Sequence, residues 1–194
     1  MILYLHGFRS SPQSFKARLI AERMQALGLD AQYACPKLPA SPRAAIELAL
    51  NLVEHVAVDR LTLIGSSLGG FYANWLAELL GCRAVLLNPA VKPPRDLEKY
   101  VGVTTEFHSG EPFEFKREYI AQLQAMTVEK ISRPERYFLI AATGDEVLDW
   151  REMAAHYPGA QQRIVSGSDH GLSDFALYLD EVMQFCGVDS AGSH

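Results

Sequence analysis

The sequence has 194 residues, of which 48% are hydrophobic and 21% charged, and its formal net charge is −5 at pH 7. This composition argues against disordered, fibrous and membrane-spanning chains, and the lack of a lysine or arginine block argues against a nucleic-acid partner. No apolar run approaches the roughly 20 residues that cross a bilayer, and no leader precedes the first apolar segment, so we expect one cytoplasmic domain over residues 1–194 without membrane insertion.

Short apolar runs alternate with longer segments of helical period, which predicts a parallel sheet covered by helices. Ile2–Leu5 is the first predicted strand, and it runs into a loop at residues 6–12. The next segment predicts an amphipathic helix that Gly28 ends. Its predicted inner face holds Phe15, Leu19, Ile20, Met24 and Leu27. A weak strand at 32–34 follows, and Ser41-Pro42 predicts the start of a second helix.

The middle of the chain predicts a strand and a helix separated by a very short turn. Leu61–Ile64 has the composition of a strand, and Leu68–Leu80 that of a helix closed by Gly81. Only residues 65–67 remain to connect the two. The next strand is predicted at Ala84–Leu87.

The last part of the chain predicts two further strands, at Tyr137–Ala141 and Arg163–Val165, and a closing helix at Phe175–Phe185. Residues 93–134 show no period of two, and we interpret them as a short, helical, cap-like insertion over the sheet. The complete order of elements predicts the α/β class, with a mostly parallel sheet flanked by helices.

The short turn carries the pattern G-x-S-x-G, as Gly65-Ser66-Ser67-Leu68-Gly69. In α/β-hydrolases this pattern forms the nucleophile elbow, a strained strand-to-helix turn that presents a serine hydroxyl above the sheet. The two glycines leave room where the strand and the helix nearly touch. We therefore predict Ser67 as the nucleophile of a compact α/β-hydrolase fold; the alternative is a glycine-rich turn without chemistry.

A serine hydroxyl needs a base that takes its proton, and His170 is the predicted base. It lies in the loop between the last strand and the last helix, where this fold places its histidine. A plain loop histidine is the alternative. The other histidines are interpreted as surface or loop residues without a proton-transfer role: His6, His55, His108, His156 and His194.

The acid that orients the histidine is predicted at Asp145, directly after the strand at Tyr137–Ala141. The chain order Ser67, Asp145, His170 is the order expected for this fold. Asp149 is the rival, although N-capping of the following helix also explains that residue.

Two backbone N–H groups should stabilise the negative charge that develops on the substrate carbonyl oxygen. One belongs to Leu68, directly after the nucleophile. The other is predicted at Phe8, in the loop that follows the first strand.

Five motifs along nearly the whole chain resemble the small bacterial YqiA-type esterases. They are His6-Gly7-Phe8, Ser10-Ser11-Pro12, Gly65 to Gly70, Asn88-Pro89-Ala90 and Thr143 to Leu148. The resemblance implies a compact α/β-hydrolase that cleaves carboxylic esters, with acyl thioesters among its substrates, and a triad at Ser67, Asp145 and His170. Arg9 departs from the family pattern, since a small polar residue is expected there.

We therefore expect a serine hydrolase that acts on a small-molecule ester or thioester through an acyl-enzyme, with no metal and no organic cofactor. Three cysteines at wide spacing, with no C-x-x-C pair, also argue against a disulfide framework or a zinc site. A thioesterase or acyltransferase with the same triad, or a binding protein on this fold, remains an alternative. Five aromatic residues of the insertion could line an acyl pocket or form its core: Tyr100, Phe107, Phe113, Phe115 and Tyr119.

Overall fold

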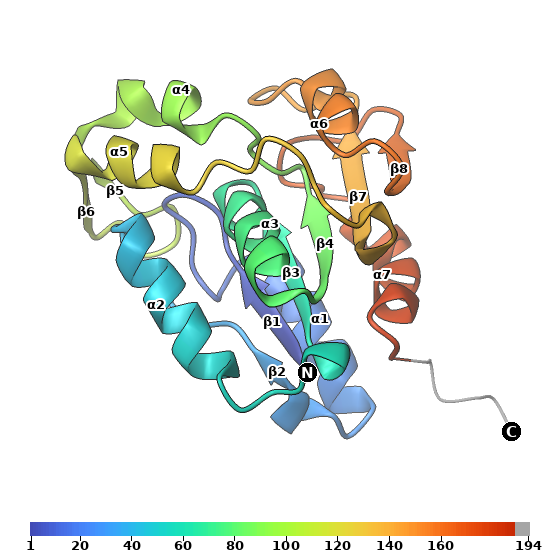
Figure 1. Ribbon diagram of the computed structural model, residues 1–194. Coiled ribbons are helices and arrows are strands. Elements are labelled where there is room, and N and C mark those ends of the chain that lie inside the picture. Colours follow the sequence, from blue (N-terminus) through green and yellow to red (C-terminus); the bar gives the residue numbers. More distant parts are fainter. Residues whose placement is uncertain (189–194) are drawn as a thin grey trace, which may run out of the picture.

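Six parallel strands form one sheet in the computed structural model, which describes residues 1–188 (Figure 1). The spatial order of the strands is β2-β1-β3-β4-β7-β8. Their bounds are Ile2–Leu5 (β1), Tyr33–Ala34 (β2), Thr62–Ser66 (β3), Arg83–Leu87 (β4), Tyr137–Ala142 (β7) and Gln161–Val165 (β8). The sheet confirms the predicted α/β class, and every strand predicted from the sequence is present.

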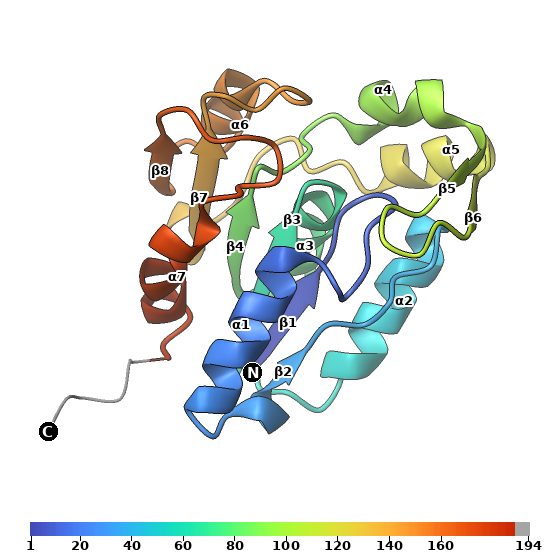
Figure 2. The same cartoon turned by 180° about the vertical axis from the view of Figure 1, so that it is seen from behind.

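Helices cover both faces of the sheet. On one face lie α1 (Phe15–Ala26) and α7 (Leu179–Phe185), as Figure 2 shows, and on the other lie α2 (Pro42–Val53), α3 (Leu68–Leu80) and α6 (Trp150–His156). Successive residues of a strand point to opposite faces, so the core forms two layers. Tyr4 of β1, for example, packs in the layer of α1, whereas Leu5 packs in the layer of α3.

Two of the helices differ from the prediction. The predicted closing helix is broken: residues Phe175–Leu177 form a 3₁₀ turn in which the Tyr178 N–H donates to the Phe175 carbonyl, before α7 begins. Phe15, expected on the inner face of α1, is 43% exposed because it lies in the first turn, beyond the edge of the core. The other predicted helix limits hold, and Ser41 caps α2 by accepting the N–H of Ala44.

Residues 93–125 lie beyond the carboxyl ends of β1 and β3, and residues 126–134 run back toward the amino end of β7, where the Ser132 N–H donates to Glu78 near the end of α3 (Figures 1 and 2). The predicted insertion at 93–134 therefore covers the sheet only with its first part. Residues 93–125 contain two helices, α4 (Pro93–Leu97) and α5 (Glu118–Ala125), as expected of a helical insertion. They also contain an antiparallel hairpin that the sequence did not predict, with strands β5 (Gly102–Thr105) and β6 (Pro112–Phe115). Each strand has only four residues; β5 is largely exposed and β6 turns only Phe113 and Phe115 inward, so the alternation is too short to be clear in the sequence.

The remaining short elements are 3₁₀ turns at Asp30–Gln32, Val58–Arg60, Glu98–Tyr100 and Pro134–Arg136. Within residues 1–188, no helix combines the length and the apolar character needed to cross a membrane. Cys35, Cys82 and Cys186 are free thiols.

Candidate active site

The turn between β3 and α3 places Ser67 at the carboxyl edge of the sheet, with φ 54° and ψ −120°. A non-glycine residue rarely adopts this backbone conformation, and such strain is typical of functional turns. The close approach of strand and helix explains the flanking glycines. A Cβ on Gly65 would lie 2.2 Å from the Gly69 carbonyl oxygen, and a Cβ on Gly69 would lie 1.9 Å from that of Leu5.

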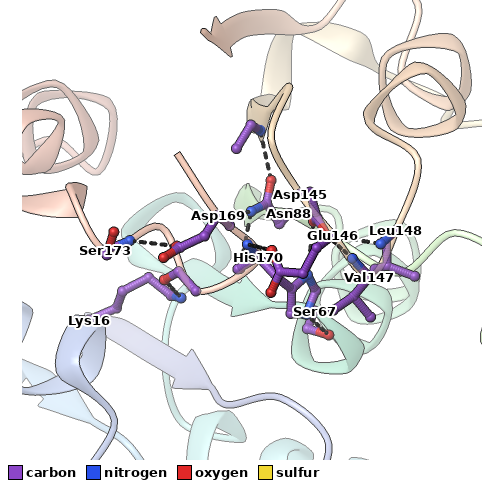
Figure 3. A network of polar contacts seen from close by, with 12 residues as sticks. Lys16, Ser67, Asn88, Asp145, Glu146, Val147, Leu148, Asp169, His170 and Ser173 are labelled. Atoms are coloured by element: carbon purple, nitrogen blue, oxygen red, sulfur yellow. Dashed lines mark hydrogen bonds and ion pairs between the residues drawn. The ribbon is translucent and has the colours of Figure 1, made fainter. Parts of the chain in front are cut away.

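His170 lies beside the serine, in the loop that follows β8 (Figure 3). Its Nε2 is 3.0 Å from the Ser67 Oγ, and its Nδ1 is 2.8 Å from an Asp145 carboxylate oxygen. The structure therefore brings together the three side chains that the sequence singled out, across 103 residues between the serine and the histidine. The imidazole retains 21% exposure, whereas the Asp145 side chain is fully buried.

The Asp145 carboxylate is fixed by its own loop. Its second oxygen accepts the N–H groups of Val147 and Leu148, each at 2.8 Å, which turns the first oxygen toward His170. An ionised carboxylate only accepts hydrogen bonds, so it holds the proton on Nδ1 and leaves Nε2 free to accept the serine hydroxyl. Asp149, the rival acid, instead accepts the Arg151 N–H at 2.9 Å and caps α6.

Two side chains that the sequence analysis did not assign to the site hold the His170 loop. The Asn88 amide is fully buried; it donates to the carbonyls of Asp169 (3.0 Å) and His170 (3.1 Å), and its oxygen accepts the Ala142 N–H at 2.8 Å. The Glu146 carboxylate accepts the His170 N–H at 3.0 Å. Asn88 directly follows β4 in the same way that Ser67 follows β3, and this position was the signal that could have revealed it.

The loop after β1 lies against the serine. A Cβ on Gly7 would be 3.2 Å from the Ser67 Cβ, so glycine permits this approach. Within residues 1–188, neither the Phe8 nor the Leu68 N–H donates to a protein group. Both predicted oxyanion donors are therefore unengaged beside the serine hydroxyl.

His6 holds this loop rather than facing the serine. Its Nε2 accepts the Leu38 N–H at 2.9 Å, so Nδ1 carries the proton and donates to the Gly7 carbonyl at 3.0 Å. Burial lowers the pKa of the His6 imidazole and favours this neutral form.

Arg9 joins the same loop to the hairpin. Its Nε donates to the Thr105 carbonyl at 2.5 Å, its guanidinium lies 4.3 Å from the centre of the Phe107 ring, and its own carbonyl accepts the Phe107 N–H at 2.9 Å. The residue that departs from the family pattern thus links the hairpin to the loop that carries Phe8, beside the contacts that the Phe8 ring makes with Tyr100, Phe113 and Phe115.

Two cavities flank Ser67 and share Phe8, Phe107 and His170 as walls. The first has a volume of about 270 Å³ and the second of about 190 Å³. Some aromatic residues of the insertion line a cavity and others form its core, so both expected roles occur. Tyr100 and Phe107 line the second cavity. Phe113, Phe115 and Tyr119 form a core behind it, in which the Phe8 ring packs edge-on against Phe113 and Phe115 at 5.2 Å.

Within residues 1–188, the remaining histidines lie apart from this site. The His55 side chain is 91% exposed, and His156 packs edge-on against Tyr157. His108 lies in the exposed turn of the hairpin, and His194 lies outside the described residues. The described part of the chain contains no group of three histidine, cysteine or carboxylate side chains placed to hold a metal ion.

Similar folds occur among solved structures. Est1E from Butyrivibrio proteoclasticus, solved with ferulic acid bound, is 15% identical with a TM-score of 0.73, over 98% of this chain and 89% of that one. Alpha/beta hydrolase domain-containing protein 10 from mouse is 15% identical with a TM-score of 0.70, over 94% and 89%. The esterase domain of a Rhodothermus marinus protein is 21% identical with a TM-score of 0.66, over 95% and 85%. These likenesses establish an α/β-hydrolase fold.

The family can be stated as well. A family model described as "Uncharacterised protein family (UPF0227)" matches residues 1–187, and the chain belongs to this family, which is the YqiA family. The resemblance drawn from the five sequence motifs is thereby confirmed.

Proposed function

We propose that this protein is a serine hydrolase that cleaves carboxylic esters, and acyl thioesters, through a Ser67–His170–Asp145 triad. The observation that carries the proposal is the unbroken hydrogen-bond chain from the Ser67 Oγ through the imidazole to the Asp145 carboxylate, with distances of 3.0 and 2.8 Å. Neither a structural serine nor a plain loop histidine requires this alignment beside two cavities.

In the first half of the reaction, the Ser67 Oγ attacks the carbonyl carbon as its proton passes to the His170 Nε2. The Asp145 carboxylate stabilises the imidazolium that forms. The negative charge on the carbonyl oxygen is stabilised by the unengaged N–H groups of Phe8 and Leu68, and by the N-terminal end of α3. When the tetrahedral intermediate collapses, the imidazolium returns the proton to the leaving alcohol or thiol.

In the second half, His170 takes a proton from water as the water oxygen attacks the acyl-enzyme, and the acid is released with Ser67 restored. An acyltransferase would use the same residues with an alcohol, thiol or amine in place of water. Product analysis in the presence of such acceptors separates the two reactions.

The decisive experiment compares Ser67→Ala with Ser132→Ala. Ser132 is exposed, and its hydroxyl accepts a hydrogen bond from the Arg136 guanidinium at 3.0 Å, away from the candidate site. We expect Ser67→Ala to lower kcat for p-nitrophenyl butyrate by about 10⁴-fold or more while the far-UV spectrum is preserved, and Ser132→Ala to retain full activity. A fluorophosphonate probe should label the wild-type protein at Ser67. A wild-type protein that neither turns over esters nor reacts with the probe would indicate a binding protein instead.

A further inference from the structure

The first cavity has a polar wall that the proposed reaction does not use. Beside the shared residues, it is lined by four hydroxyl side chains and one lysine. These are Tyr4, Ser10, Ser14, Ser66 and Lys16. No acidic residue stands among the described residues that line it, whereas Asp96 lines the second cavity together with apolar side chains such as Leu97 and Leu148. Among residues 1–188, Lys16 is the one lysine, arginine or carboxylate residue in the lining of the first cavity, whereas the lining of the second combines Asp96 with Arg9 and Lys99.

Lys16 is the most unusual of these residues because it is only 7% exposed. Its ammonium group donates one hydrogen bond, to the Gly171 carbonyl, and forms no salt bridge within residues 1–188 (Figure 3). Burial lowers the pKa of this amine to about 8, and the nearby carboxylates of Asp169 and Asp145 oppose that shift. At pH 7 the Lys16 amine is therefore largely charged, and two of its three N–H groups have no hydrogen-bond acceptor within residues 1–188.

Two independent features add to this positive wall. Helix α1 begins at the cavity, with Ser14, Phe15 and Lys16 in the lining, and no side chain caps its first N–H groups. Such an end favours negative charge. The Tyr4 side chain is fully buried in the same wall; its hydroxyl lies near those of Ser14 and Ser66 and has no hydrogen-bond partner in the described part of the chain.

We propose that this polar cavity binds a carboxylate carried by the substrate, so that the preferred esters or thioesters have an anionic group on the part that occupies it. The inference rests on the proposed function, because the carboxylate is positioned relative to the Ser67 hydroxyl. A buried ammonium with few partners gains from a counter-ion, and a single formal charge matches a monoanionic carboxylate better than a dianionic phosphate.

The test measures a preference rather than an activity, because Lys16 also supports the loop that carries His170. The substrates are mono-p-nitrophenyl esters of dicarboxylic acids of five to eight carbons, each paired with an uncharged ester in which two methyl groups replace the carboxylate oxygens. The measured quantity is kcat/KM for the charged ester divided by kcat/KM for its uncharged partner. At the chain length that the wild-type protein prefers, we expect Lys16→Met to lower this ratio by about 10- to 100-fold, which is the effect of losing one charge-assisted hydrogen bond. Any disturbance of His170 affects both substrates and cancels in the ratio.

Lys99→Met is the matched control, since Lys99 is an exposed cation that lines the second cavity. Its ratio should change less than twofold. Lys16→Gln, which keeps a polar side chain, provides a second variant if Lys16→Met does not fold. The proposal would be overturned if the wild-type protein preferred the uncharged esters, or if the Lys16 and Lys99 variants changed the ratio equally.

A binding measurement separates this inference from the proposed function. Ser67→Ala protein is titrated with a monomethyl dicarboxylate and with its uncharged isostere, and binding is followed by NMR. Tighter binding of the carboxylate that is lost in Ser67→Ala/Lys16→Met supports the site even if no ester is turned over. Equal binding of both ligands contradicts it even if esters are hydrolysed.

Discussion

The serine and the histidine of the candidate site are held in place by different means. Ser67 is fixed by backbone packing, because glycines allow α3 to lie directly against β1 and β3. The His170 loop is fixed by side chains that reach it from elsewhere, chiefly Asn88 and Glu146. The position of Ser67 therefore depends on glycines that have no side chain, and the position of His170 depends on side chains that hydrogen-bond to its loop. We expect substitutions around Ser67 to lower stability through steric clashes, and substitutions around His170 to act through lost hydrogen bonds.

The largest effect is expected at the elbow. Gly69→Ala would place a Cβ 1.9 Å from the Leu5 carbonyl oxygen, so α3 must move away from the sheet. We expect the free energy of unfolding, measured in urea, to fall by about 3 kcal/mol or more. Gly28→Ala is the control: its φ of +68° strains an alanine, but no atom lies within 4 Å of the new Cβ. That variant should lose only about 1–2 kcal/mol, and equal losses would refute the role of close packing.

An intermediate effect, on the rate as well as on stability, is expected at Asn88, whose buried amide makes three hydrogen bonds. Its φ of +42° suits glycine, so Asn88→Gly removes the three hydrogen bonds without adding backbone strain. We expect kcat for p-nitrophenyl butyrate to fall about 10- to 100-fold with little change in KM, because a small misplacement of the base is costly. The rate of fluorophosphonate labelling should fall in parallel.

Asp149→Ala provides the comparison for Asn88. It removes a hydrogen bond on a neighbouring loop, to the Arg151 N–H, and the loss of this helix cap should cost about 1 kcal/mol. Its labelling rate should match that of the wild type. If both variants were slowed equally, Asn88 would be a general stabilising residue rather than one that positions His170.

The smallest effect concerns His6, which holds the loop beside Ser67 in its neutral form. Because burial lowers its pKa in the folded protein, the unfolded chain binds the proton more readily. The His6 contribution to stability is therefore present above the unfolded pKa of about 6.5 and is lost as pH falls through the folded pKa. Between pH 7.5 and 5, the free energy of unfolding should decline less steeply for His6→Gln than for the wild type. His55→Gln, at an exposed side chain, should keep the wild-type slope.

The same contrast explains what the sequence could reveal. The elbow is a local arrangement, so Gly65, Ser67 and Gly69 are adjacent in a recognisable pattern, and the strands around it are continuous apolar runs. The contacts that hold the His170 loop come from the residue after β4, from the loop after β7 and from α1, and no spacing rule links these segments. The sequence shows Asn88 only as part of a family motif and does not reveal that it holds the His170 loop. No sequence pattern marks Lys16.

The hairpin was missed for a related reason. Its strands are paired only with each other, β5 has no buried residue, and the inward face of β6 consists of Phe113 and Phe115 alone, so the alternation covers too few residues to stand out in the sequence. Arg9 is one of the residues that attach the hairpin, and its role becomes clear only when Thr105 and Phe107 are seen beside it.

That attachment has a mechanical consequence. Arg9 follows Phe8 directly and contacts the hairpin through both its guanidinium group and its main-chain carbonyl. An outward displacement of the hairpin would therefore pull on the Phe8 amide, which we propose as an oxyanion donor. Under the proposed mechanism, the hairpin would have to keep its present position while the oxyanion forms.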